Sequence, residues 1–217
     1  QKRLLTGLAL FAILAVVVLS GSQLLLAIVL VGASCLALTE FWSMFWVSGR
    51  QGLKAVGLAL AALIVGLSYM GVHLGLVLGL CLWLLNLFYL ICFQGRRTWP
   101  WPDVAVIAAG LVYIPLSLQF FVHLKGVECA LVLGAVFASD TAAYYTGSLW
   151  GQRKLWPSIS PKKTWAGSLG GLMACILVCW GIGLSLGRGG VGLWLTVGVV
   201  LNLAAQLGDL FESALKR

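Results

Sequence analysis

Long, uninterrupted apolar segments constrain this chain more than any other feature of its sequence. A membrane-spanning helix needs roughly 18 or more predominantly apolar residues in a row, and eight segments meet that requirement. They cover residues 4–20, 23–46, 53–70, 74–93, 104–123, 127–150, 167–187 and 190–216. Only 9% of the residues are charged, whereas soluble domains carry about 25%. The sequence therefore predicts an all-α, polytopic integral membrane bundle of about eight transmembrane helices.

The positive charges are sorted between alternate loops of this topology. Twelve of the fourteen Lys and Arg residues fall on the side that holds both termini: Lys2, Arg3, Arg50, Lys54, Arg96, Arg97, Arg153, Lys154, Lys162, Lys163, Lys216 and Arg217. Only Lys125 and Arg188 fall on the opposite side. Because cytoplasmic loops are enriched in Lys and Arg, both termini are predicted to be cytoplasmic. The net charge of +8 thus indicates topology and contact with an anionic bilayer surface, and no nucleic-acid partner is expected.

The domain organisation follows from the same pattern. No internal repeat and no long linker divides the sequence, so residues 1–217 are predicted to form a single membrane domain. Residues 4–20 resemble the apolar core of a signal peptide, but no cleavage site follows, and we interpret them as the first membrane helix. Residues 1–125 then supply N-terminal helices, whereas residues 126–217 contain the polar groups that could carry chemistry.

The densest polar cluster begins inside the sixth apolar segment. Asp140 lies about ten residues before the end of that segment, which places it roughly 15 Å inside the membrane at 1.5 Å per residue. A carboxylate at this depth costs several kcal/mol unless it is paired or hydrated. Tyr144, Gly147 and Gly151 follow on the same helix face. The glycines would let backbone or a ligand approach closely.

The last apolar segment carries a continuous polar stripe. Its members recur at intervals of four, three, four and three residues, and they are Asn202, Gln206, Asp209, Ser213 and Lys216, with Glu212 beside them. A polar stripe on a membrane helix faces the bundle interior or a water-filled cavity. Two inward-facing helices would therefore bring Asp140 and Asp209 to one site.

A basic loop over residues 152–166 joins the sixth and seventh segments. Residues 160–164 supply hydroxyls, the ammonium groups of Lys162 and Lys163, and backbone N–H groups near the start of a helix, where phosphates bind. Mg²⁺ favours one or two carboxylates together with substrate phosphates. Two carboxylates beside lysines thus favour metal-assisted phosphoryl-group chemistry.

Three segments of the chain resemble the phosphatidate cytidylyltransferase family, also called CDP-diacylglycerol synthases. Residues 139–147 are similar to the family's aspartate-containing helix, residues 160–167 to its SPxKTxxG loop, and residues 208–217 to the opening of its C-terminal motif. The order and spacing of the segments agree as well. Together the similarity covers about residues 139–171 and 202–217, whereas the first 130 residues match only as helical membrane sequence.

The resemblance implies a reaction and a set of site residues. CMP would pass from CTP to phosphatidate, giving CDP-diacylglycerol and pyrophosphate, with Mg²⁺ as cofactor and a second metal ion left open. Asp140 and Asp209 would hold the metal and act in catalysis with Lys163, which falls on the family's fixed lysine. The expected substrate-binding residues are Tyr144, Gly147, Ser160, Lys162, Thr164, Glu212, Ser213, Lys216 and Arg217. A homodimer in the inner (cell) membrane, with its active site facing the cytoplasm, is also implied.

Two features depart from the family pattern. Ala166 stands where the family often has Glu or Gln, which removes one polar contact. The family motif normally continues past the position of Arg217 through a Lys-Asp pair, a Pro-Gly-His-Gly-Gly stretch and an Asp-Arg-x-Asp end. These parts would carry further metal and substrate groups, so we expect little activity from the 217 residues alone.

Other interpretations of the same residues stay open at this point. A polytopic transporter or channel would line an acidic pathway with the two polar stripes, although the sequence lacks the inverted repeat common in transporters. A catalytically silent membrane fragment is another interpretation. A CDP-alcohol phosphotransferase is not supported, because its DGxxAR pattern is missing from the sequence. Glu40 fits two roles equally well: it joins the site, or it pairs with a cation such as Arg50.

Overall fold

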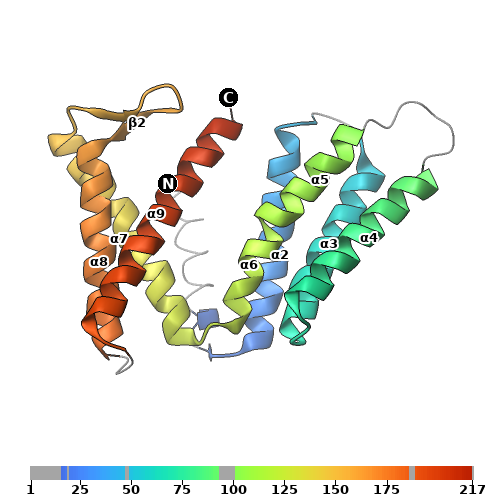
Figure 1. Cartoon of the computed structure of the whole chain (residues 1–217), viewed down its shortest axis with the longest axis horizontal. Helices are drawn as coiled ribbons and strands as arrows, with labels where there is room; N and C mark the ends of the chain where they lie inside the picture. The colour runs from blue at the N-terminus through green and yellow to red at the C-terminus, as the bar shows by residue number, and fades with distance from the viewer. Residues whose placement is uncertain (1–15, 19, 47–48, 93–100, 186–188, 217) are drawn as a thin grey trace. The chain divides into compact units, whose positions relative to one another are not determined.

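The computed structural model describes residues 16–18, 20–46, 49–92, 101–185 and 189–216 (Figure 1). Six helices in this part of the chain are long and apolar enough to cross a membrane: Gln23–Ser43, Gln51–Tyr69, Pro102–His123, Gly126–Trp150, Trp165–Ser185 and Val191–Leu215. Helix α4 (Leu74–Cys92) is a further apolar helix. The prediction of an all-α, polytopic membrane protein is confirmed. The predicted helix over residues 4–20 lies almost entirely outside the described residues.

The chain forms two compact units, Gln1–Gly126 and Val127–Arg217. The first unit contains α2 (Gln23–Ser43), α3 (Gln51–Tyr69), α4, α5 (Trp101–Tyr113), α6 (Pro115–Leu118) and the 3₁₀ helix η1 (Gln119–His123). Its core includes Leu38 and Trp42 of α2, Ile64 of α3 and Ile107 of α5, all fully buried. Every described residue that was assigned a catalytic or binding role lies in the second unit, whereas Glu40, whose role was left open, lies in the first.

The fifth predicted helix is interrupted. A continuous helix over residues 104–123 is predicted, but the structure has α5, which begins earlier at Trp101 and ends at Tyr113, followed by α6 and η1. Pro115 explains the break, because proline lacks an N–H donor and its ring clashes with the carbonyl four residues earlier. The predicted membrane span over residues 104–123 is thus confirmed as Pro102–His123, and the structure adds an interruption at Pro115.

A buried carboxylate links two segments of the first unit. Asp103, in the first turn of α5, pairs with the guanidinium of Arg50 and accepts a hydrogen bond from Trp46 Nε1 at 3.1 Å. The Asp103 side chain is 8% exposed. Arg50 is thus engaged by Asp103, whereas the side chain of Glu40 is exposed.

We expect Asp103→Ala to destabilise the first unit by about 1–3 kcal/mol, because it leaves the indole N–H and the guanidinium without their buried acceptor. A thiol-reactive dye that reports exposure of the buried cysteines on heating would measure the effect. Glu40→Ala changes an exposed carboxylate of the same unit and should shift the unfolding free energy by less than about 0.5 kcal/mol. Equal shifts for the two variants would contradict this prediction.

The second unit consists of three helices that lie side by side in Figure 1: α7 (Gly126–Trp150), α8 (Trp165–Ser185) and α9 (Val191–Leu215). Its buried core comprises Leu131, Ala135, Cys175 and Cys179, against which Val132, Val178, Ile182, Trp194, Val197 and Leu201 pack. These side chains come from all three helices, so the core fixes them as one unit.

Small residues let α7 and α8 approach closely. A Cβ atom at Gly167 would lie 2.7 Å from the carbonyl oxygen of Ala143 and 3.4 Å from the Cα of Gly147. One at Gly171 would lie 3.0 Å from the carbonyl oxygen of Ser139. Small residues four positions apart are a common means of bringing membrane helices into backbone contact. Gly147 therefore meets the backbone of α8.

The predicted loop over residues 152–166 joins α7 to α8 and contains a β-hairpin that was not predicted. Strand β1 (Lys154–Trp156) pairs antiparallel with β2 (Ser160–Thr164). The Ile159 N–H donates to the Trp156 carbonyl at 3.2 Å, which closes a four-residue turn with Pro157 in its second position. Proline is favoured at that position of a β-turn, and it is the local signal that could have indicated the hairpin.

Candidate functional site

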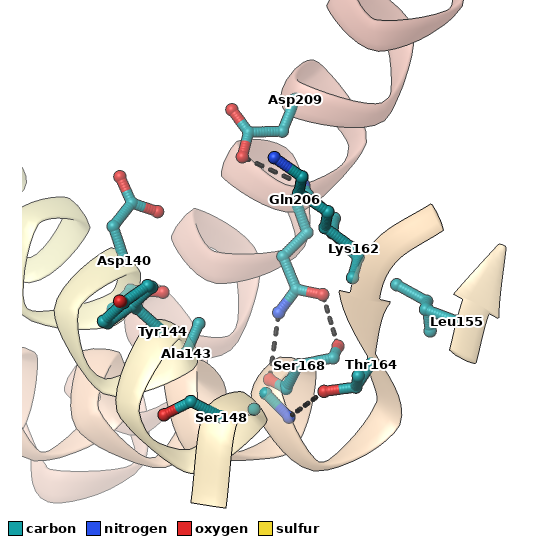
Figure 2. Close-up of a pocket in the computed structure, with 14 residues that line it drawn as sticks. Asp140, Ala143, Tyr144, Ser148, Leu155, Lys162, Thr164, Ser168, Gln206 and Asp209 are labelled. Atoms are coloured by element: carbon teal, nitrogen blue, oxygen red, sulfur yellow. Dashed lines mark hydrogen bonds and ion pairs between the residues drawn. The ribbon is translucent and has the colours of Figure 1, made fainter. Parts of the chain in front are cut away.

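A cavity of about 410 Å³ lies among α7, α9, the hairpin and the start of α8 (Figure 2). Seven of the predicted site residues line it: Asp140, Tyr144, Gly147, Lys162, Lys163, Thr164 and Asp209. Ser139, Ser168 and Gln206 also contribute to its wall. Its volume falls within the range typical of small-molecule sites, roughly 300–1,000 Å³.

The two predicted acids face this cavity from different helices. Figure 2 shows Asp140 on α7 and Asp209 on α9, with both carboxylates directed toward the cavity. Lys163 Nζ donates to Asp209 Oδ2 at 2.9 Å, and the two side chains are 27% and 55% exposed. Asp140 interacts electrostatically with both of these groups. The structure thus brings the acids and the lysine together, as the two polar helix faces predict, while their catalytic roles stay predictions.

The donor set fits a metal ion that is shared with a ligand. Among the residues that the structure describes, no group of three or more His, Cys, Asp and Glu side chains could hold a metal ion. Mg²⁺, however, usually takes only one or two carboxylates and completes its coordination with phosphate oxygens and water. Asp140 and Asp209 are therefore compatible with a metal–phosphate complex rather than a closed protein site.

The start of α8 forms another wall of the cavity. Thr164 is buried, and its Oγ1 accepts a hydrogen bond from the Gly167 N–H at 3.1 Å, so it caps the helix. This cap explains why α8 begins at Trp165, two residues before the predicted start. Helix N-termini favour anions, and the exposed side chain of Lys162 lines the same cavity.

The remaining candidates lie elsewhere. Of those that the structure describes, Ser160, Glu212, Ser213 and Lys216 are not part of the cavity lining. Ser160 is paired with Trp156 in the hairpin, and Glu212 forms an ion pair with Lys216 one turn along α9. Arg217 lies outside the described residues. Their contacts with substrate stay predictions.

Comparison with known proteins decides the family. The model described as "Cytidylyltransferase family" matches residues 1–217. The chain belongs to the cytidylyltransferase family. It is 36% identical over 120 residues to a phosphatidate cytidylyltransferase of Staphylococcus aureus (strain COL). It is also 36% identical over 120 residues to one of Staphylococcus haemolyticus (strain JCSC1435). Each match covers 53% of this chain and 46% of the relative, so the chain spans about half the length of these relatives.

In this cytidylyltransferase-family chain, hydrogen bonds between neutral side chains join the three helices beside the cavity. Gln206 Nε2 donates to the Ser168 carbonyl at 3.0 Å and to Asn202 Oδ1 at 2.5 Å, and Ser168 Oγ donates to Gln206 Oε1. Asn202 Nδ2 donates to Ser139 Oγ at 2.7 Å. The polar stripe predicted that Asn202 and Gln206 face inward. Their serine partners were not predicted, because single serines among small residues give no periodic signal.

Proposed function

We propose that this protein is a membrane-embedded phosphatidate cytidylyltransferase, which transfers CMP from CTP to phosphatidate and releases pyrophosphate. The observation that carries the proposal is the meeting of Asp140, Asp209 and Lys163 at one polar cavity. The family, and the names of the Staphylococcus relatives, indicate the substrates. We have no specific observation that favours the transporter alternative.

Each group at the cavity has a role in this reaction. Asp140 and Asp209 would hold Mg²⁺, which neutralises charge on the triphosphate and on the departing pyrophosphate. Lys162, Lys163 and the N-terminus of α8 would bind and orient phosphate oxygens. A phosphate oxygen of phosphatidate forms a bond to the α-phosphorus of CTP, and the bond from that phosphorus to the oxygen bridging to the β-phosphorus breaks. Because the attacking phosphate is already anionic, the site needs no general base.

We also propose that the protein lies in the inner (cell) membrane and that its cavity opens to the cytoplasm. The hairpin beside the cavity belongs to the cation-rich side of the predicted topology, and such loops are typically cytoplasmic. The family resemblance further suggests a homodimer, which the mass of the detergent-solubilised protein would test. To test the cytoplasmic placement, a cysteine is introduced at the exposed Ser158 and treated with a membrane-impermeant thiol reagent. Labelling that occurs only after the cells are opened would support the placement.

The position of a radioactive phosphate tests the reaction itself. Membranes that contain the intact protein are given phosphatidate and CTP labelled at either the α- or the γ-phosphate. We expect the α-label to enter a lipid product and the γ-label to leave as pyrophosphate. Incorporation of the γ-label into lipid would indicate a lipid kinase instead. Uptake of label into vesicles without a labelled lipid would support a transporter.

We expect Lys163→Ala to lower kcat/KM for CTP by about 10–100-fold, since hydrogen bonds to charged groups contribute roughly 1.5–3 kcal/mol. Initial rates at varied CTP concentration would measure this. Lys154→Ala serves as the matched control, because Lys154 is a described cation of the same hairpin that does not line the cavity. If both variants lost the same activity, a general effect of hairpin charge would replace the assigned role of Lys163.

A further inference from the structure

The network of neutral side chains described above ends close to both candidate metal-binding acids. Ser139 immediately precedes Asp140 in α7. Gln206 lies three residues before Asp209 and therefore on the same face of α9. Ser168 lies in α8, one turn after Thr164, and lines the same cavity as Lys163. A displacement within the network would thus move the acids relative to each other.

Gln206 is arranged to hold other residues rather than to bind a ligand. An amide side chain has two N–H groups to donate. Gln206 Nε2 donates both, to the Ser168 carbonyl and to Asn202 Oδ1, while Gln206 Oε1 accepts from the Ser168 hydroxyl. Although Gln206 lies at the cavity wall, its donors are directed at the protein (Figure 2).

The buried end of the network gives it a single preferred arrangement. Asn202 is 1% exposed and Ser139 is 3% exposed. An amide in such surroundings is costly unless it is hydrogen-bonded, and a fully satisfied polar network specifies one packing. Rotation or sliding of α9 against α7 would separate Asn202 from Ser139, so the hydrogen bonds disfavour both movements.

We propose that Gln206 is a positioning residue. Together with Asn202 it fixes the rotation of α9, and it thereby holds Asp209 at the cavity that Asp140 also lines, where the two acids would share a metal ion. The binding of a metal ion by the two acids rests on the proposed function. The dependence of the Asp209 position on Gln206 rests on the hydrogen bonds alone.

Gln206→Leu tests the proposal, because it keeps most of the side-chain volume and removes the amide. Loss of a residue that orients metal ligands typically costs about 10–100-fold in metal affinity or activity. We therefore expect the Mg²⁺ concentration for half-maximal activity to rise at least about tenfold, while KM for CTP at saturating Mg²⁺ stays nearly unchanged. Thr196→Val is the control, since the Thr196 hydroxyl donates to the Gly192 carbonyl of its own helix. An unchanged Mg²⁺ requirement in Gln206→Leu would overturn the proposal.

A double-mutant cycle tests whether the residues act as one network. Ser168→Ala removes a single hydroxyl and offers a milder variant if Gln206→Leu does not accumulate. Residues in one hydrogen-bond network have non-additive effects. The double variant should therefore be no more than slightly worse than Gln206→Leu in its Mg²⁺ requirement. If the increase in Mg²⁺ requirement of the double variant equalled the product of the two single increases, the residues would act independently, which would count against the proposal.

A cross-linking measurement does not depend on activity. Asp140→Cys and Asp209→Cys are combined in one protein, and a short bifunctional thiol reagent joins the two positions. We expect Gln206→Leu to slow this cross-linking severalfold and Thr196→Val to leave it unchanged. An unchanged rate in Gln206→Leu would overturn the positioning role. Slower cross-linking by Gln206→Leu, combined with a failure of the unsubstituted protein to transfer CMP, would support the positioning role and overturn only the proposed function.

Discussion

Asp209→Asn should nearly abolish CMP transfer. A metal ion bound at a catalytic site supplies several kcal/mol of transition-state stabilisation, and each 1.36 kcal/mol is tenfold in rate, so we expect kcat to fall on the order of 10³-fold. The substitution keeps the shape of the side chain and removes the charge that would hold the metal. It also removes the charged partner of Lys163. Release of pyrophosphate from CTP, with and without phosphatidate, would measure the loss.

The control for Asp209→Asn neutralises another carboxylate of the same unit. Glu128 lies in the first turn of α7, twelve residues before Asp140 and hence about 18 Å along the helix. Glu128→Gln should retain most of the activity. If Asp209→Asn kept a rate within about tenfold of the parent, its carboxylate would have no essential place at the metal.

Gly167→Val should produce the largest loss of stability. A Cβ atom at this position would lie 2.7 Å from the carbonyl oxygen of Ala143 and 3.2 Å from Thr164 Oγ1. Because the nearest atom belongs to the backbone, α7 and α8 must move apart to admit a larger side chain. Overpacking typically costs about 1–3 kcal/mol and occasionally more, and we expect the upper end of that range here. Thermal unfolding in detergent would measure this destabilisation. The variant should also lose activity at a lower temperature than the parent protein.

The same helix offers a matched control. Gly181 lies in α8, and no atom would approach within 4 Å of a Cβ at that position. Gly181→Val should change the unfolding free energy by less than about 0.5 kcal/mol, as surface substitutions usually do. If Gly181→Val destabilised the protein as much as Gly167→Val, the cause would be the backbone preference of valine rather than the contact between helices.

The helices could be predicted because the bilayer leaves few alternatives. An apolar segment in lipid must satisfy its backbone groups internally, so length and composition suffice to predict a helix. The convergence of Asp140 and Asp209 was also predictable, since polar faces of membrane helices avoid lipid. Each acid stands on such a face, and the structure places both at one cavity.

Other features depend on information that the apolar pattern does not contain. The hairpin rests on backbone pairing between Lys154 and Thr164, and its short strands lack an alternating pattern. Pro115 is a local signal for the break after α5. The break was not predicted because residues 104–123 form one continuous apolar segment. The pairing of Asn202 with Ser139 depends on how α7 and α9 are aligned, which is a tertiary property. Helix existence was therefore predictable, whereas helix alignment was not.

The ion pair between Lys163 and Asp209 has a consequence for the resting protein. The ammonium group of Lys163 supplies a counter-charge to the Asp209 carboxylate, whose side chain is half-exposed. Under the proposed function, a metal ion would compete with Lys163 for the Asp209 carboxylate, and a displaced ammonium group would be available to bind a phosphate oxygen.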